Sequence, residues 1–276
     1  MIPRDFQFSQ SSLQDFSTCP RRFRLFYLDR LRWPAVEAEP IREAERLARL
    51  GQDFHRLVQQ HLVGIQAETL SAYLQTNDAD LRRWWQNYLR HRPDWLEAAQ
   101  LYPELTLSTP LLGYRLLARF DLLAVRPDGG FVIIDWKTSQ RKAKLADPGQ
   151  RIQTRVYRYV MCMAGQAFNG GQPIDPARVQ MIYWYAQFPD EPEEFGYSLA
   201  HFQEDEQVLT RLLEQIIASD FPLVEDSKPC RQCVYRSYCG RGEKAGDLSD
   251  GLLAREVDEP LEAVSLDWEQ IAEIQF

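Results

Sequence analysis

Two acidic residues and a lysine near the middle of the chain are the best candidates for chemistry. Asp121 is followed, after a short gap, by the trio Asp135-Trp136-Lys137. Side chains alternate between the two faces of a strand, so Asp135 and Lys137 are expected on one face and Trp136 on the other. Carboxylates that bind a divalent cation, with a lysine beside them, suit the hydrolysis of phosphodiester bonds. An isolated Asp-x-Lys is more often a surface ion pair, so its surroundings decide between the two interpretations.

A tight turn would bring the two carboxylates together. If the turn has three residues, 127–129, with Gly129 left-handed, Asp121 lies directly opposite Asp135 on the neighbouring strand. Cross-strand neighbours lie about 5 Å apart at Cβ, where two carboxylates repel unless a cation lies between them. Mg²⁺ or Mn²⁺ would meet that need. Lys137 would then stabilise the negative charge that grows on the phosphate, or help position the attacking water.

Four cysteines have the spacing of a second metal centre, which joins the two ends of the chain. They are Cys19 and the cluster Cys230-x2-Cys233-x5-Cys239. Four thiolates can bind either zinc or an iron-sulfur cluster, so the spacing leaves both open. Either centre would fasten the segment around Cys19 to the segment after residue 229, and we expect this role to be structural. The fifth cysteine, Cys162, lies in an apolar helical stretch and is interpreted as a small buried hydrophobe.

Charge is distributed unevenly along the chain. The formal net charge is -8, but residues 241–276 alone hold ten acidic and three basic residues, so the rest is close to neutral. Basic residues cluster after the first cysteine and again after Lys137. A positive groove that binds nucleic acid is therefore compatible with overall acidity, because the local field governs phosphate binding. Each run alone could instead be a solvated helix face. The residues predicted to contact DNA are Arg141, Lys142, Arg151 and Arg155.

Hydrophobic periodicity predicts a mixture of helices and strands around these residues. A first helix follows the Ser9–Ser12 start signal, with a break at Cys19-Pro20. Further helices are expected over residues 41–63, 67–75, 78–91, 149–164 and 203–218. Strands are expected over residues 101–107, 114–125, 131–136, 178–186 and 195–200.

Length and composition favour a compact, intracellular protein. The 276 residues, 45% of them hydrophobic, suit one large domain or one domain with additions. No apolar run approaches the roughly 18 residues of a membrane span, and the N-terminus does not have the pattern of a signal peptide. Cysteines at metal-ligand spacing favour reduced thiols over a disulfide framework. We therefore expect a cytoplasmic protein that does not associate with membranes.

The order of these residues resembles the PD-(D/E)XK nuclease superfamily, specifically its RecB-like branch. The resemblance covers residues 9–240, and the four cysteines are similar to those of the iron-sulfur subset, which includes the AddB nuclease domain and CRISPR-associated adaptation nucleases. The matching positions, in chain order, are Gly51-x3-His55, Glu104, Asp121, Asp135-Trp136-Lys137 and Gln153-x3-Tyr157.

The resemblance implies a role for each position. His55, Asp121 and Asp135 would bind Mg²⁺ or Mn²⁺, and Lys137 would be the catalytic lysine. Gln153 and Tyr157, four apart on one helix face, would contact DNA and support the site. Glu104 matches a strand acid of the family less securely and is equally compatible with an exposed strand residue. The resemblance also favours [4Fe-4S] over Zn²⁺ at Cys19, Cys230, Cys233 and Cys239.

The implied fold is an α/β, restriction-endonuclease-like core: a small mixed β-sheet flanked by helices, with a helical insertion near residues 66–98 and metal-fastened ends. Residues 1–240 would form the nuclease domain and residues 241–276 an acidic tail. That tail is interpreted either as a solvated segment with one packed helix, or as a competitor that covers the basic groove or docks on a partner.

The predicted activity is metal-dependent hydrolysis of DNA, as an exonuclease in repair or recombination, acting on single strands or DNA ends. Two alternatives stay open: processing of CRISPR prespacers, and a DNA-end-binding or partner subunit that does not cut. The chain has no Gly-x4-Gly-Lys-Ser/Thr phosphate loop. Any helicase motor or CRISPR adaptation partner would therefore be a separate protein.

Overall fold

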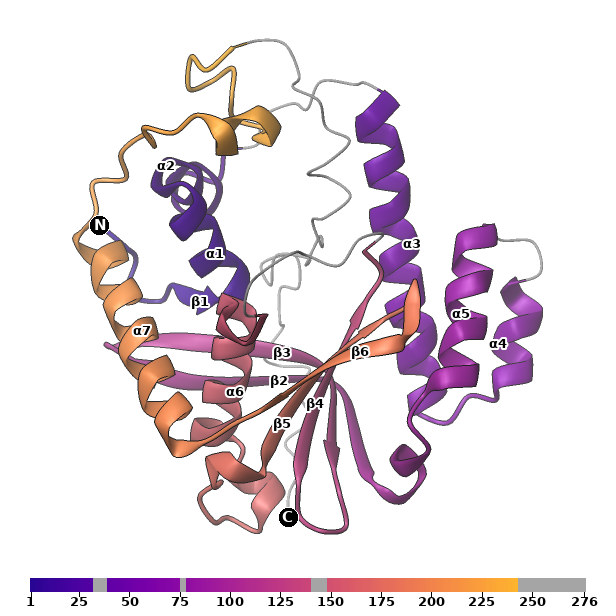
Figure 1. Cartoon of the computed structure of the whole chain (residues 1–276). Coiled ribbons are helices and arrows are strands. Elements are labelled where there is room, and N and C mark those ends of the chain that lie inside the picture. The colour runs from indigo at the N-terminus through magenta and orange to yellow at the C-terminus, as the bar shows by residue number, and fades with distance from the viewer. Residues whose placement is uncertain (32–38, 75–77, 140–147, 243–276) are drawn as a thin grey trace.

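A computed structural model describes residues 1–31, 39–74, 78–139 and 148–242. These residues form a mixed sheet of six strands with helices on both faces, as Figure 1 shows, which confirms the expected α/β class. The strands are β1 (Gln7–Ser9), β2 (Gln100–Leu111), β3 (Tyr114–Val125), β4 (Phe131–Lys137), β5 (Val179–Tyr185) and β6 (Phe188–Gly196). The α-helices are α1 (Gln10–Thr18), α2 (Pro20–Phe23), α3 (Glu39–Leu62), α4 (Ala67–Tyr73), α5 (Ala79–His91), α6 (Ile152–Ala164) and α7 (Leu199–Ala218).

The strands pair in the order β1-β3-β4-β5-β6, and β2 pairs along the other side of β3. The hairpins β2–β3, β3–β4 and β5–β6 are antiparallel, whereas β1–β3 and β4–β5 are parallel. A parallel pair needs a crossover connection, and α6 lies in the crossover from β4 to β5. The central strand β4 is buried along its whole length.

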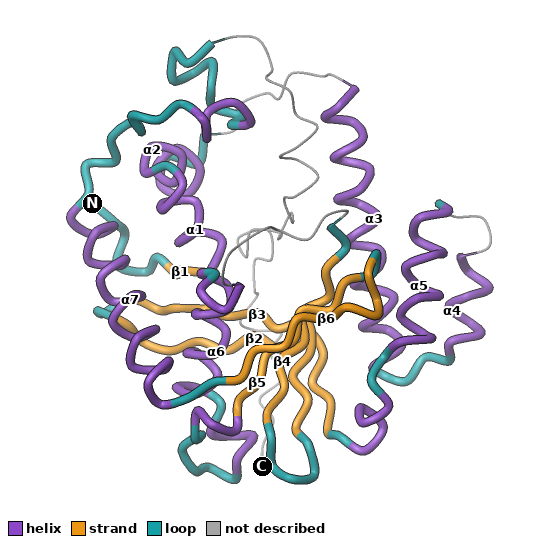
Figure 2. The backbone as a smooth tube through the Cα atoms, viewed as in Figure 1, coloured by secondary structure: helices purple, strands orange, loops and turns teal. Residues whose placement is uncertain are grey.

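Two hydrophobic cores lie on opposite faces of the sheet. One contains side chains of α1, α6 and α7, and the other contains those of α3, α4 and α5 (Figure 2). Trp136 belongs to the second core, with Trp84, Trp85, Tyr88 and Trp184. Asp135 and Lys137 therefore face the first core side, where α6 packs, as the alternation along β4 requires.

The turn between β3 and β4 has the predicted geometry. The amide of Arg126 donates to the carbonyl of Gly130 over 2.8 Å, which leaves a three-residue turn, and Gly129 has a φ of 81°. The register pairs Leu122 with Ile134. Continuing that register by one residue places Asp121 across from Asp135, as the sequence predicts.

Strand β3 changes its neighbour at Asp121. Before it, residues 115–117 pair with β1, and after it, residues 122–125 pair with β4. The alternation of side chains breaks at the same place, because Phe120 lies in the first core and Leu122 in the second. Opposite Asp121 on β2, Glu104 has a φ of 54°, which is unusual for a residue other than glycine. The site is therefore built where the regular sheet is interrupted.

Some sequence expectations were wrong. Residues 195–200 were expected to be a strand, but β6 ends at Gly196, and Ser198 caps α7, which begins at Leu199. Most of β6 was not predicted, because its sequence is rich in acidic residues and prolines and its side chains are largely exposed. Strand β1 was not predicted because three residues are too few to show periodicity. The break at Cys19-Pro20 is confirmed, since α1 ends at Thr18 and α2 begins at Pro20. Residues 243–276, most of the predicted acidic tail, lie outside the described residues.

Candidate active site

The carboxylate of Asp121 lies at the centre of the site. The amide of Trp136 donates to its Oδ2 over 2.7 Å, and His55 Nδ1 lies 3.4 Å from its Oδ1. His55 reaches it from α3, which passes close to the end of β4. At Gly51, one turn before His55, an added Cβ would lie 2.9 Å from Oγ1 of Thr138. The absence of a side chain at residue 51 therefore lets the helix bring His55 to the sheet.

Glu104 completes a group of three possible metal ligands. One ligand atom each from His55, Glu104 and Asp121 lies within 4.8 Å of the other two, in the described part of the chain. Two carboxylates and an imidazole are ligands that Mg²⁺ and, still more, Mn²⁺ accept. These three residues thus fit a divalent cation. Sequence reasoning treated Glu104 as an uncertain site residue, whereas the structure places it beside the two others.

The charges of the group favour a positive charge among the carboxylates. Burial would lower the pKa of His55, but the carboxylates of Asp121, Asp135 and Glu104 outweigh it and raise that pKa to about 9. Burial and the nearby charge of Asp121 raise the pKa of Glu104, and Arg119 offsets this only in part. A histidine proton compensates the clustered carboxylates, and a bound cation would take its place.

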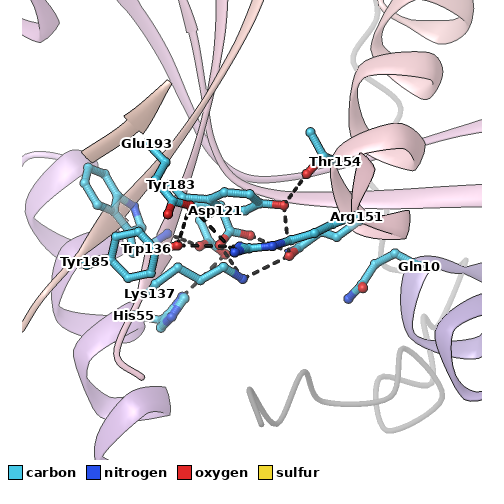
Figure 3. A network of polar contacts seen from close by, with 12 residues as sticks. Gln10, His55, Asp121, Trp136, Lys137, Arg151, Thr154, Tyr183, Tyr185 and Glu193 are labelled. Carbon is cyan, nitrogen blue, oxygen red and sulfur yellow. Dashed lines mark hydrogen bonds and ion pairs between the residues drawn. The ribbon is translucent and has the colours of Figure 1, made fainter. Parts of the chain in front are cut away.

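A second network of polar contacts surrounds Lys137 (Figure 3). Asp135 and Lys137 are only 3% and 4% exposed, and Lys137 Nζ lies 2.7 Å from Asp135 Oδ2. Gln153, from α6, joins both: its Nε2 donates to Asp135 Oδ1 over 2.7 Å, and its Oε1 accepts from Lys137 over 3.0 Å. Asp135 does not belong to the three-residue group, and in this structure Lys137 and Gln153 each engage one of its oxygens.

Tyrosines of β5 support this network, and sequence reasoning missed them. Tyr183 pairs with Asp135 in the parallel register, and its hydroxyl donates to Gln153 Oε1 over 3.3 Å and lies 2.7 Å from Thr154 Oγ1. Lys137 Nζ lies 5.0 Å from the centre of its ring. Tyr183 thus fixes the amide that binds both catalytic candidates. The only signal was an apolar, aromatic strand at 178–186, which does not reveal its neighbour.

A family model matches this chain, and solved structures are similar to it. A sequence model of the PD-(D/E)XK nuclease superfamily matches residues 7–240. This chain belongs to the PD-(D/E)XK nuclease superfamily. No curated protein matches the chain. Among solved structures, it is similar to SSO0001, with 14% identity over 88% of this chain and 90% of the other and a TM-score of 0.43. It is also similar to a candidate exonuclease from Eubacterium rectale, with 11% identity over 95% and 94% of the chains and a TM-score of 0.49.

Two predicted DNA contacts have other roles in this PD-(D/E)XK protein. Tyr157 is 4% exposed, and its ring packs against Phe120, with 5.2 Å between ring centroids, so it supports the strand before Asp121. Arg155 is 7% exposed and pairs with Asp205 and Glu204 of α7. Neither side chain is open to DNA, which corrects the prediction. The physical reason is that Arg155 faces α7, which supplies its counter-charges, whereas Tyr157 faces the sheet.

Of the other predicted DNA contacts, Arg151 lies in the described part of the chain, and Arg141 and Lys142 do not. Arg151 lies at the edge of the polar network of this PD-(D/E)XK site, with its guanidinium 5.1 Å from the centre of the Tyr183 ring. Its Nη2 lies 3.7 Å from Glu193, and its Nη1 donates to the hydroxyl of Tyr185 over 3.5 Å. Arg141 and Lys142 lie outside the described residues.

The four cysteines of the PD-(D/E)XK chain come from segments that the fold brings together. The ring of Phe221 stacks on that of Phe23, and Tyr235 donates to the carbonyl of Leu31 over 2.8 Å. Burial raises the pKa values of Cys233 and Cys239, with smaller contributions from Cys19 and Cys230 to both and from Cys233 to that of Cys239. No three cysteine sulfurs among the described residues lie within 4.8 Å of one another. No described helix is long and apolar enough to cross a membrane.

Proposed function

We propose that this protein is a divalent-metal-dependent deoxyribonuclease that hydrolyses phosphodiester bonds of DNA. The observation that carries the proposal is the group formed by His55, Glu104 and Asp121 beside the buried Asp135–Lys137 pair. The lysine held against a carboxylate at 4% exposure, beside three possible metal ligands, supports cutting over binding alone. Burying such charges costs free energy, and catalytic sites commonly contain buried charged groups despite that cost.

His55, Glu104 and Asp121 would hold the cation, with Asp135 as a further ligand. A bound Mg²⁺ or Mn²⁺ would lower the pKa of a water and neutralise phosphate charge. Lys137 would stabilise the negative charge that grows on the scissile phosphate, because the bond from its Nζ to Gln153 directs the ammonium. Gln153 would keep that ammonium and the Asp135 carboxylate in fixed relative positions.

The finer statements rest on the resemblance to RecB-like nucleases. They are exonuclease action on single strands or DNA ends, a role in repair or recombination, and cooperation with a separate helicase. Arg151, beside the network, stays a proposed contact to the DNA backbone. Arg141 and Lys142 are also proposed contacts to the DNA backbone, because they belong to the run of basic residues that follows Lys137 in the sequence.

We further propose that Cys19, Cys230, Cys233 and Cys239 bind a [4Fe-4S] cluster that fastens the two ends of the domain. Their mutual influence on pKa supports their proximity. Thiolates around one zinc ion would lie about 3.8 Å apart, since Zn–S bonds are about 2.3 Å and tetrahedral. In a cubane cluster each thiolate binds a different iron, so the sulfurs lie farther apart. The resemblance to the iron-sulfur subset of the family supports the cluster over zinc.

The test is degradation of end-labelled DNA, single- and double-stranded, by anaerobically purified protein with Mg²⁺, Mn²⁺ or EDTA. We expect cutting that requires the metal and that falls more than about 100-fold in Asp121→Asn. Asp190→Asn, which changes an exposed carboxylate of β6, is the matched control and should cut normally. The positions of the labelled products would also show polarity and distinguish an exonuclease from an endonuclease. Failure of the wild type to cut any DNA with either metal would refute the proposal.

A further inference from the structure

The backbone of Glu104 has a conformation that residues other than glycine rarely adopt. Its φ of 54° lies in the left-handed region, inside a strand whose flanking residues Pro103 and Leu105 pair regularly with β3. Only glycine, and less often Asn or Asp, adopts this region without strain, which costs of order 1–3 kcal/mol per residue. Such strain persists only where surrounding contacts hold it, and it is concentrated at functional sites.

Arg119 supplies the contact that holds the strained side chain. Its Nη2 lies 2.7 Å and its Nε 2.9 Å from the same oxygen, Oε2 of Glu104. The side chain of Glu104 is 16% exposed and that of Arg119 is 39% exposed, so the carboxylate is largely shielded from solvent and the guanidinium is partly accessible to it. Oε1 of Glu104 accepts no hydrogen bond from the described residues. Arg119 thus engages one carboxylate oxygen and leaves the other available.

The position of Arg119 in the sheet explains why it can do this. It lies on β3 two residues before Asp121, and Asp121 is the residue across from Glu104 in the β2–β3 register. Diagonal neighbours on antiparallel strands are within reach of long side chains. Arg119 also lowers the repulsion between the two carboxylates, since its charge opposes the rise in the pKa of Glu104 that burial and Asp121 cause.

We propose that Arg119 is a positioning residue that holds Glu104, in its strained conformation, as a ligand of the catalytic cation. This inference rests on the proposed function, because it concerns the same metal site. Removing Arg119 should weaken metal binding more than it slows the reaction at saturating metal, because the arginine acts on the ligand and does not touch the phosphate.

The test measures Mn²⁺ binding directly, by the electron paramagnetic resonance signal of the free ion, on the full chain without DNA. For Arg119→Gln we expect the dissociation constant of Mn²⁺ to rise about 10- to 100-fold, the usual effect of losing a partner of a ligand. Arg119→Lys keeps the charge but not the two parallel N–H donors, so it should recover only part of the affinity. Arg115→Gln, on the same strand and bonded to Ser108, is the matched control and should bind Mn²⁺ like the wild type.

A second pair of variants tests the strain itself. Glu104→Gly and Glu104→Ala should both weaken Mn²⁺ binding, and the glycine variant should melt at a higher temperature than the alanine variant in the metal-free protein, because both lose the carboxylate and only glycine accepts the positive φ. A lower melting temperature for the glycine variant than for the alanine variant would show that residue 104 is not held under strain.

The outcomes separate this inference from the proposed function. Unchanged Mn²⁺ affinity in Arg119→Gln, in a wild type that binds Mn²⁺ and cuts DNA, would overturn the role of Arg119 alone. A wild type that binds no Mn²⁺ would overturn both.

Discussion

At the scale of single residues, Gln153 links the two catalytic candidates. Its amide donates to Asp135 and accepts from Lys137, and Tyr183 fixes the same oxygen. An amide is suited to this position because it both donates and accepts, whereas an ionised carboxylate only accepts. The Gln-x3-Tyr pattern was predicted to contact DNA and to support the site. In the structure its glutamine orders the site and its tyrosine packs inside the core.

This arrangement predicts which of two substitutions of Gln153 slows cleavage more. Gln153→Ala should reduce kcat about 10- to 100-fold, because Lys137 and Asp135 lose their shared partner. Gln153→Glu should be worse, because a second carboxylate beside Asp135 repels it. Single-turnover cleavage at saturating Mn²⁺ measures both, with Gln180→Ala, whose side chain bonds to Glu194 of β6, as control. If Gln153→Glu cuts as fast as the wild type, Gln153 does not donate to Asp135 in the active protein.

Cys162 is the cysteine without a proposed ligand role. Burial raises its pKa to about 12, so at pH 8 almost all of it is the unreactive thiol. We expect iodoacetamide to leave Cys162 unmodified in the native protein and to alkylate it after unfolding in guanidinium, as mass spectrometry of its peptide would show. Equal alkylation rates in both states would contradict its position in the core.

At the scale of elements, the site depends on how closely α3 approaches β4. A Cβ at Gly51 would lie 2.9 Å from Thr138 Oγ1, so the glycine is needed for contact and not for helix formation. Glycine in a helix is less stable than alanine by about 1 kcal/mol, which the protein accepts at this position.

A double-mutant cycle tests this contact. In a Thr138→Ala background, Gly51→Ala should stabilise the protein by up to about 1 kcal/mol, the helix propensity gain. In the wild-type background the steric contact should cancel that gain or reverse it, giving a coupling energy of about 1 kcal/mol. Chemical denaturation of the four proteins measures it. Additive effects within about 0.3 kcal/mol would mean that the helix does not approach Thr138 as described.

The elements also show what the sequence could and could not predict. The turn at Gly129, and with it the proximity of Asp121 and Asp135, follow from local rules of hairpin geometry. The positive φ of Glu104 could not be predicted, because nothing in its neighbours signals it. The pairing of β4 with β5, which brings Tyr183 to Asp135, depends on strand order and not on the sequence of either strand. Arg155 was misjudged because its partner Asp205 is distant in the chain.

At the scale of the whole molecule, the cysteines connect the N-terminal segment to the segment that follows α7. The two segments already touch through Phe23, Phe221, Leu31 and Tyr235. A metal centre there would close a loop that contains every strand of the sheet except β1, and closing long loops lowers the entropy of the unfolded chain.

Anaerobic preparations should therefore contain about four iron and four sulfide per chain. Cys19→Ser and Cys230→Ser should lose them and melt at lower temperature, whereas Cys162→Ser should keep them. Metal analysis and thermal unfolding under argon provide both readings. Stoichiometric zinc without iron would replace the cluster by a zinc site, and normal stability in Cys19→Ser would end the proposed structural role.

The most direct measurement of the central claim couples metal binding to cleavage in one sample. Mn²⁺ is titrated into wild type and Asp121→Asn, and bound Mn²⁺ and the rate of cutting of an end-labelled DNA are followed together. If His55, Glu104 and Asp121 hold the catalytic cation, the rate rises with the same half-saturation as binding, and Asp121→Asn loses both. Cutting that persists in Asp121→Asn, or Mn²⁺ bound tightly by a wild type that cuts no DNA, would contradict the account.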